Sequence, residues 1–293
     1  MAEHSYGESG WAGTGDGRRL HYMTRGEGET TVVFASGMGL SRSVWGLVQP
    51  LVAARTRAVV YDRAGTGRSD DDPEPLTLGR MAADLDALLR ALGDGPFVLV
   101  GHSWGGPLVR AAAAAEPDRV RGLVLVDPTD ERCELYFARA ARRRFALTRR
   151  LVAAMARTGL YRPMAARPGM VQPPDVAAEH RAEDFTVRAA RTMAAELKCL
   201  LEDLGPLRAE PPSLGDLPVT VISGTAPARF DRGVRAAVTD AHRRTADALP
   251  NGRLVPAQAS GHLVMFTEPE LIAAEALRLV YTAARVEAEA SRR

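Results

Sequence analysis

A serine between glycines in "GHSWG", residues 101–105, is the strongest candidate for chemistry in this sequence. Its spacing is G-x-S-x-G, with the apolar run "FVLV" before it and an alanine-rich run after it. A serine in such a strand-to-helix turn needs neighbours without Cβ atoms, which Gly101 and Gly105 provide. The turn also places the Ser103 hydroxyl at a helix N-terminus, where the helix dipole favours an oxyanion. We therefore predict that Ser103 is a nucleophile and not an ordinary turn residue.

A serine nucleophile needs a general base, and the chain has six histidines. His262 is the candidate, because it follows Ser260-Gly261 just after the last predicted strand and precedes a helix that opens with "TEPE". The other five are assigned elsewhere: His4 to the N-terminal tail, His21 to an early strand, His102 to the face of its strand away from the serine, His180 to an inserted helix, and His242 to the solvated face of a polar helix.

Strand-like runs alternate with helical patterns along most of the chain, which indicates an α/β fold with helices on both faces of the sheet. The runs "AVVYD", "FVLV", "GLVLV" and "VTVIS" are continuously apolar, as strands buried on both faces should be. The predicted strands are 19–25, 31–35, 57–62, 97–100, 122–126, 219–223 and 253–258. The predicted helices are 43–55, 77–92, 104–116, 232–249 and 268–285.

The alternation stops after "LVLVDPT" and resumes only at "LPVTVISG". Residues 129–216 between these runs contain two helical stretches, separated by the proline-rich "YRPMAARPGMVQPPD". The stretches span 130–158 and 175–204. We interpret this region as a helical lid that divides the sheet domain into residues 1–128 and 217–293.

The lid carries a basic cluster, "ARRRFALTRR", at residues 141–150. A solvated helix face is the favoured interpretation, and a clamp for an anionic substrate group is the alternative. Apolar side chains are spaced between and beside these arginines, at Phe137, Phe145, Leu147 and Leu151. We expect them to close the lid over an apolar pocket.

The chain resembles the α/β-hydrolase superfamily over nearly its whole length, because four segments occur in the family's order. Besides the serine turn, "VVFASGMGLSRSVW" is similar to the oxyanion loop, "VVYDRAGTGRSD" to the D-x-x-G-x-G-x-S turn, and "ASGHLVMFTEPE" to the histidine loop. The resemblance implies a mostly parallel sheet of about eight strands with the lid after the sixth. It also implies that His262 is the base and that the backbone N–H groups of Met38 and Trp104 form the oxyanion hole. Ser36-Gly37 stands where the family usually has His-Gly, which should leave these backbone donors intact.

The carboxylate that orients the histidine stays open. The family most often carries it shortly after the strand "VTVISG", but "TAPAR" follows here and no carboxylate comes before Asp231. Asp231 could equally be the N-cap of the next helix. The family's other position is the end of the preceding strand, where "GLVLVDPTD" offers Asp127, with Asp130 three residues later. We favour Asp127 over Asp231.

The turn that contains Asp62 and Arg63 is rich in glycine and could suggest a phosphate-binding loop. The third glycine of G-x-G-x-x-G is absent, however, and no P-loop lysine follows. We interpret this turn as structural.

Composition narrows the function classes further. The chain has 38 basic and 36 acidic side chains, so it lacks the charge excess typical of nucleic-acid-binding proteins. Cys133 and Cys199 form neither a metal-type nor a redox-type pair. The first residues do not resemble a signal peptide, and no apolar window reaches the ~18 residues of a membrane span. The shortage of lysine and abundance of arginine and alanine suggest a bacterial source. We expect a cytoplasmic protein with neither a membrane nor a nucleic-acid partner.

These observations predict a serine hydrolase that uses no metal and no cofactor. It would cleave an ester, thioester or lactone of a small acyl substrate with an apolar portion, through an acyl-enzyme on Ser103. Hydrolysis of a C–C bond, amide cleavage and perhydrolysis stay open. So does a ligand-binding or cyclase-like protein without hydrolysis, because no acid occupies the family's usual place.

Overall fold

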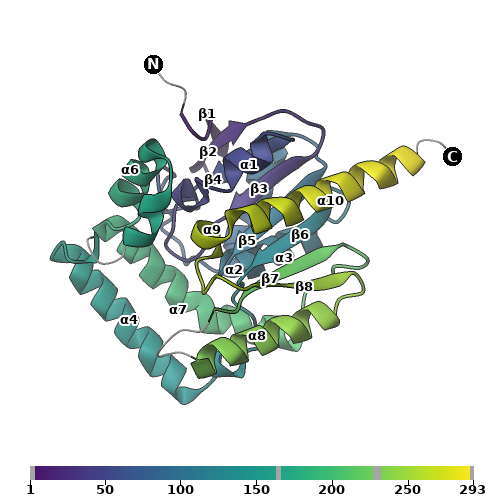
Figure 1. The fold of residues 1–293 in the computed structure, drawn as a ribbon. Coiled ribbons are helices and arrows are strands. Elements are labelled where there is room, and N and C mark those ends of the chain that lie inside the picture. The colour runs from purple at the N-terminus through teal and green to yellow at the C-terminus, as the bar shows by residue number, and fades with distance from the viewer. Residues whose placement is uncertain (1–3, 163–165, 227–231, 291–293) are drawn as a thin grey trace.

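A sheet lies at the centre of the computed structural model, which describes residues 4–162, 166–226 and 232–290 (Figure 1). Within these residues the sheet has eight strands in the order β1-β2-β4-β3-β5-β6-β7-β8. The strands are β1 Glu8–Gly13, β2 Arg19–Arg25, β3 Thr31–Ala35, β4 Arg57–Tyr61, β5 Phe97–His102, β6 Val120–Val126, β7 Val219–Gly224 and β8 Gly252–Ala257. Strand β2 is antiparallel to both of its neighbours, and the other adjacent pairs are parallel. The predicted α/β fold with a mostly parallel sheet is confirmed.

Helices cover both faces of this sheet (Figure 1). One face carries α1 Gln49–Ala53, α9 Val264–Thr267 and α10 Pro269–Ala290, and the other carries α2 Leu78–Leu92, α3 Gly105–Ala115 and α8 Arg232–Asp247. Strand β5 contributes to both cores, with Val98 and Val100 on the α10 side and Phe97 and Leu99 on the α2 and α3 side. Its run is continuously apolar because neither face meets water.

The helical insertion lies between β6 and β7, as predicted. It consists of η2 Glu134–Tyr136, α4 Arg139–Arg157, η3 Arg167–Val171, α6 Pro174–Glu183 and α7 Val187–Ala209. The stretch expected at 175–204 is two helices, because Thr186 has an extended backbone and its hydroxyl caps α7 by accepting the Ala189 N–H at 3.1 Å. Helix α7 contacts both α4 and the sheet domain, so α4 lies outermost (Figure 1).

Two elements differ from the sequence-based expectation. Strand β1 was not predicted, because it is an edge strand with Ala12 as its one buried residue and therefore lacks an apolar pattern. The helix expected at 43–55 is instead the 3₁₀ turn η1 Arg42–Trp45 followed by the short α1. Pro50 lies at the start of α1, and proline cannot occupy the interior of a helix without breaking its hydrogen bonds.

The turn from β5 into α3 is as tight as the glycines of "GHSWG" suggest. A Cβ atom on Gly101 would lie 2.2 Å from the carbonyl oxygen of Gly105, and one on Gly105 would lie 2.4 Å from that of Ala35. Neither approach is compatible with a side chain. The two glycines therefore allow β5, α3 and the end of β3 to meet, with Ser103 at their junction.

Candidate functional site

Three predicted residues lie at the carboxyl edge of the sheet, where open α/β sheets bind ligands. Ser103 follows β5, Asp127 follows β6, and His262 follows β8. Backbone hydrogen bonds hold the first two together, since the Ser103 N–H donates to Val126 O at 3.1 Å and the Thr129 N–H donates to Ser103 O at 2.9 Å. The order of the parallel strands therefore brings residues far apart in sequence to one edge.

Ser103 and Asp127 share an unusual backbone conformation. Their φ angles are +52° and +40°, and within the described part of the chain they are the only residues other than glycine with positive φ. Such a conformation costs on the order of 1–3 kcal/mol for a residue with a Cβ atom, and it clusters at functional sites. The surrounding backbone bonds compensate this cost and fix the direction of both side chains.

The carboxylate of Asp127 contacts the imidazole of His262. His262 Nδ1 lies 2.7 Å from Asp127 Oδ2, while Oδ1 accepts the Gly224 N–H at 3.0 Å. Arg235 of α8 donates to both oxygens, at 2.5 and 3.1 Å. Burial opposes ionisation, but the hydrogen bonds from His262 and Arg235 outweigh it and hold the pKa of Asp127 well below its usual value. An ionised carboxylate only accepts, so Nδ1 carries the proton and Nε2 of neutral His262 is an acceptor.

His102 links the serine turn to the histidine loop. Its Nε2 lies 3.0 Å from the carbonyl oxygen of His262, and the two rings lie 4.7 Å apart. A carbonyl can only accept, so Nε2 is the protonated nitrogen of His102. Burial and the neighbouring His262 lower the pKa of His102 to about 3. His102 is therefore neutral near pH 7 and holds the backbone of His262 beside the turn.

The loop after β3 runs directly beside Ser103. A Cβ atom on Gly37 would lie 3.2 Å from Ser103 Cβ. In the same region Trp104 is completely buried and Met38 is half-buried. These are the two residues whose N–H groups the family resemblance singled out.

Two charged side chains that the sequence did not single out as site residues hold this loop. Arg63 donates to Ser36 O at 2.5 Å and to Gly37 O at 2.7 Å, and its Nε donates to Glu196 at 2.9 Å. Glu196 also accepts the Gly39 N–H at 2.7 Å. Arg63 was predicted only as a structural turn residue. Glu196 was not predicted at all, because it lies on a helix of the insertion and belongs to no recognisable motif.

The family profile of alpha/beta hydrolases matches residues 32–275, which is most of the chain. The chain belongs to the alpha/beta hydrolase family. Its described residues include no helix that is long and apolar enough to cross a membrane. No group of three histidine, cysteine or carboxylate side chains among them could hold a metal ion.

Proteins named as hydrolases are similar to parts of this chain. A protein named carbamate hydrolase RutD from Azorhizobium caulinodans is 37% identical over 108 residues, which are 37% of this chain and 40% of the relative. The 2-hydroxy-6-oxononadienedioate/2-hydroxy-6-oxononatrienedioate hydrolase of Paraburkholderia xenovorans is 38% identical over 122 residues, 38% of this chain and 41% of that protein. The chain thus matches less than half the length of these curated relatives.

Solved structures agree with the fold over almost the whole chain. A thermophilic esterase from Thermogutta terrifontis superposes with a TM-score of 0.71 and 23% identity, covering 94% of this chain and 98% of the esterase. The epoxide hydrolase CorEH superposes with a TM-score of 0.65 and 21% identity, covering 94% of this chain and all of that chain. At such identities the likeness shows a shared fold alone.

The sequence offers two other acidic candidates in this alpha/beta hydrolase, Asp231 and Asp130. Asp231 lies outside the described residues. Asp130 is buried, and its carboxylate accepts the Thr245 hydroxyl at 2.6 Å and the Arg132 N–H at 2.8 Å. These bonds fix Asp130 on the loop after β6 without a histidine partner at hydrogen-bond distance.

The prediction that His242 is solvated is wrong. Its side chain is completely buried, with Nδ1 2.8 Å from Ser223 Oγ and Nε2 2.8 Å from Pro128 O. Helix α8 packs on β7 and β8, so the polar sequence around His242 conceals a buried hydrogen-bonding face. Burial lowers the pKa of His242.

A second set of serine, histidine and aspartate side chains meets near the edge strand β1. His21 lies 2.8 Å from Ser9 Oγ and 3.0 Å from Asp62 Oδ2. Asp62 also accepts the Arg42 N–H, the Arg42 guanidinium and the Arg68 N–H, at 2.8, 2.7 and 3.1 Å. This buried aspartate joins three segments, which agrees with the structural interpretation of its turn.

Only two of the four apolar side chains that were expected to close the insertion over a pocket are half-buried. Phe137 and Phe145 are half-buried against the core on the α2 and α3 side of the sheet. Leu147 and Leu151, however, are 56% and 50% exposed, so the expectation that they close a pocket is wrong. Helix α4 turns Ala141 and Val152 inward instead. The arginines of the cluster at 141–150 are mostly exposed on the same helix.

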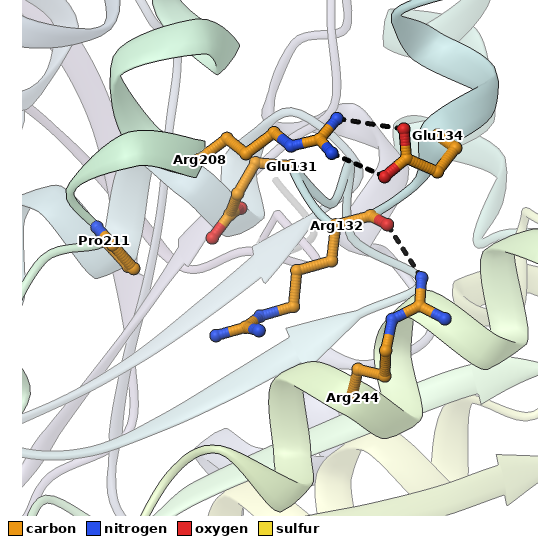
Figure 2. A pocket seen from close by; sticks show the side chains of 6 residues that line it. All are labelled: Glu131, Arg132, Glu134, Arg208, Pro211 and Arg244. Carbon is orange, nitrogen blue, oxygen red and sulfur yellow. Dashed lines mark hydrogen bonds and ion pairs between the residues drawn. The ribbon is translucent and has the colours of Figure 1, made fainter.

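A separate hollow of about 380 Å³ lies between the loop after β6, α8 and the end of α7 (Figure 2). Its lining is almost entirely charged: Glu131, Arg132, Glu134, Arg208, Pro211 and Arg244. Arg208 is paired with Glu134 at 2.6 and 3.0 Å, and Arg244 donates to the Arg132 carbonyl at 2.8 Å (Figure 2). None of Ser103, Asp127 and His262 lines this hollow, and an apolar acyl group would find few partners in it.

Replacement of His102 by Gln should change how stability depends on pH. On acidification the unfolded chain takes up a proton near the ordinary histidine pKa of ~6.5, whereas folded His102 does so only near its pKa of about 3. His102 therefore contributes stability above pH ~6.5 that is lost as pH falls towards 3, by up to about 1.4 kcal/mol per pH unit. His102→Gln keeps a donor for the His262 carbonyl but lacks this titration.

Urea unfolding at several pH values checks this expectation. Between about pH 6 and 4.5 the free energy of unfolding should fall less steeply in the variant than in the wild type, while above pH 7 the two profiles should run parallel. Parallel profiles across the whole range would contradict the neutral, buried state of His102.

Proposed function

We propose that this alpha/beta hydrolase is a serine hydrolase in which Ser103 is the nucleophile, His262 the general base and Asp127 the acid that orients it. The backbone N–H groups of Met38 and Trp104 are proposed as the oxyanion hole. The observation that carries the proposal is the 2.7 Å contact between His262 Nδ1 and Asp127 Oδ2, at the edge of the sheet where Ser103 has a φ of +52°.

Each proposed step follows from the protonation states at the site. Ionised Asp127 keeps the proton of neutral His262 on Nδ1, so Nε2 can take the proton of the Ser103 hydroxyl as Oγ attacks the carbonyl carbon. The negative charge that develops on the substrate oxygen is stabilised by the two backbone donors. His262 then gives its proton to the leaving group, and water activated by the same nitrogen hydrolyses the acyl-enzyme. No step requires a metal or a cofactor.

The proposed substrate is a small molecule with an ester, thioester or lactone bond and an apolar acyl portion. The partly apolar surroundings support this class, since Phe137 and Phe145 of the insertion pack against the same core as Met38 and Trp104. A carbamate or a C–C bond beside a ketone is the second candidate, supported by the names of the relatives that match parts of the chain. Both bonds are open to the same attack by serine on a carbonyl carbon.

A non-hydrolytic role is the remaining alternative. It rests on the absence of a carboxylate at the family's usual place after β7, whereas the contact of Asp127 with His262 supports the hydrolytic proposal. We further propose that the protein acts in the cytoplasm and that residues 129–216 form a unit that covers the site.

Labelling with a fluorophosphonate tests the nucleophile directly. The probe phosphonylates a serine only when a base activates its hydroxyl, so the wild type should gain one adduct on the peptide that contains Ser103. Ser103→Ala should abolish both the adduct and the hydrolysis of short-chain nitrophenyl esters. Mass spectrometry of the digested protein locates the adduct.

Ser9→Ala is the matched control, because Ser9 also contacts a histidine that is paired with an aspartate. It should label and hydrolyse like the wild type. An adduct that survives Ser103→Ala and disappears in Ser9→Ala, or a wild type that neither labels nor hydrolyses esters, would refute the proposed function.

Replacement of Asp127 by Asn tests the proposed acid. The amide cannot stabilise the imidazolium, and its NH₂ group favours the wrong histidine tautomer, so kcat should fall by about 10³-fold or more. Asp130→Asn removes another buried carboxylate from the same loop and should change kcat by less than about threefold, since the triad is untouched. Asp231→Asn should likewise have a small effect. Steady-state kinetics on one nitrophenyl ester measures all three, and a larger loss in Asp231→Asn than in Asp127→Asn would contradict the assignment.

A further inference from the structure

We propose that Glu196, on helix α7 of the insertion, is a positioning residue for the oxyanion hole and acts together with Arg63. The pair fixes the peptide groups on both sides of Met38, so the hole is correctly formed only while α7 lies against the sheet domain. This inference rests on the proposed function, because it concerns the same backbone donor.

Arg63 fixes the orientation of the peptide between Gly37 and Met38. In a trans peptide the C=O and N–H bonds lie in one plane and point in opposite directions. Arg63 Nη2 donates to Gly37 O at 2.7 Å, and Nη1 donates to Ser36 O at 2.5 Å. The guanidinium thus fixes the plane of this peptide, and with it the direction in which the Met38 N–H points.

Glu196 fixes the next peptide group along the chain. Its Oε2 accepts the Gly39 N–H at 2.7 Å, which holds the peptide between Met38 and Gly39. Its Oε1 lies 2.9 Å from Arg63 Nε and 2.8 Å from Nη2. One carboxylate therefore holds the loop directly and also holds the guanidinium that fixes the preceding peptide.

Burial makes the two charges depend on each other. Glu196 is completely buried and Arg63 is only 3% exposed. A buried charge without its partner is strongly unfavourable, so neither side chain can keep its place when the other is withdrawn. Loss of Glu196 would leave Arg63 charged in the protein interior and free to turn away from the two carbonyl groups.

The fit of α7 against the loops connects this pair to the position of the insertion. Thr192, Met193 and Glu196 lie on one face of α7, at a spacing of about one helical turn. A Cβ atom on Gly39 would lie 2.5 Å from Met193 Cβ, and Thr192 Oγ1 donates to Gly65 O at 2.7 Å. Helix α7 could not move away without withdrawing Glu196 from the loop.

The side chain at the family's usual histidine position does not take part. Ser36 Oγ donates to Ser41 O at 2.8 Å and accepts the Trp45 Nε1–H at 3.0 Å. The Ser36 side chain therefore stabilises the segment that contains Ser41 and Trp45. The peptides around Met38 depend on Arg63 and Glu196 instead.

Glu196→Gln is the variant that tests the proposal. The amide keeps the shape of the side chain but loses the charge. It also presents an NH₂ group either to the Gly39 N–H or to Arg63, which are both donors and need an acceptor. A displaced oxyanion donor weakens transition-state binding more than substrate binding, so kcat should fall by about 10- to 100-fold while KM changes by less than about threefold. The inhibition constant of a trifluoromethyl ketone, whose adduct on Ser103 carries an oxyanion, should rise by a similar factor.

Arg63→Lys is the second variant, in case Glu196→Gln folds poorly. Lysine keeps the positive charge beside Glu196, but a single ammonium cannot reproduce the planar fork that bonds to two carbonyl groups. It should give the same pattern, a reduced kcat with a nearly constant KM.

Glu131→Gln is the matched control. Glu131 is 1% exposed, and its carboxylate oxygens accept hydrogen bonds from Arg110 at 2.8 and 2.7 Å, whereas those of Glu196 bond to Arg63 and the Gly39 N–H. It should lower the stability of the fold and change kcat by less than about twofold. Thermal unfolding of all three variants separates loss of folded protein from loss of rate.

The inference is overturned if folded Glu196→Gln and Arg63→Lys keep the wild-type kcat, or if Glu131→Gln loses as much. Failure of the proposed function is distinguishable, because Ser103 of the wild type would then not react with the fluorophosphonate. Normal labelling of Ser103 together with an unchanged kcat in Glu196→Gln would overturn this inference alone.

Discussion

The buried carboxylate of Asp127 is the interaction on which the edge of the sheet depends. It joins the end of β6 to the Gly224 N–H at the end of β7, to Arg235 of α8 and to His262 in the loop after β8. A buried charge is stable only when its oxygens are fully bonded, so these four segments must come together in one arrangement. The positive φ of Asp127 is compensated by the same bonds.

Glu196 plays a comparable part for the neighbouring loop. It bonds the loop after β3 to the turn after β4 and to a helix from the insertion, which are far apart in the sequence. The helical insertion is therefore bonded directly to the loop that borders Ser103, through one of its carboxylates. In both cases a buried carboxylate bonds backbone N–H groups and an arginine at once, which fixes geometry more strictly than apolar packing alone.

Sequence patterns predicted the elements whose environment is uniform. Strands β3, β4, β5 and β6 are almost entirely buried, so their sequences contain continuous apolar runs and their positions were predicted to within one or two residues. Edge strand β1 has no such pattern and was missed. His242 was misjudged for a related reason, because the polar residues around it face water while its own side chain is turned into the protein.

The sequence is sufficient to predict the family and the order of its motifs, because the serine turn, the loop after β3 and the histidine loop are local patterns that need particular residue types at fixed spacings. It left the choice between Asp127 and Asp231 open, and it gave no indication of Glu196 or Arg235. Contacts between side chains on different elements depend on how strands are ordered and helices are packed, and no spacing along the chain records this. The order of the strands and the packing of the helices bring Asp127 to 2.7 Å from His262 and Glu196 to the loop after β3.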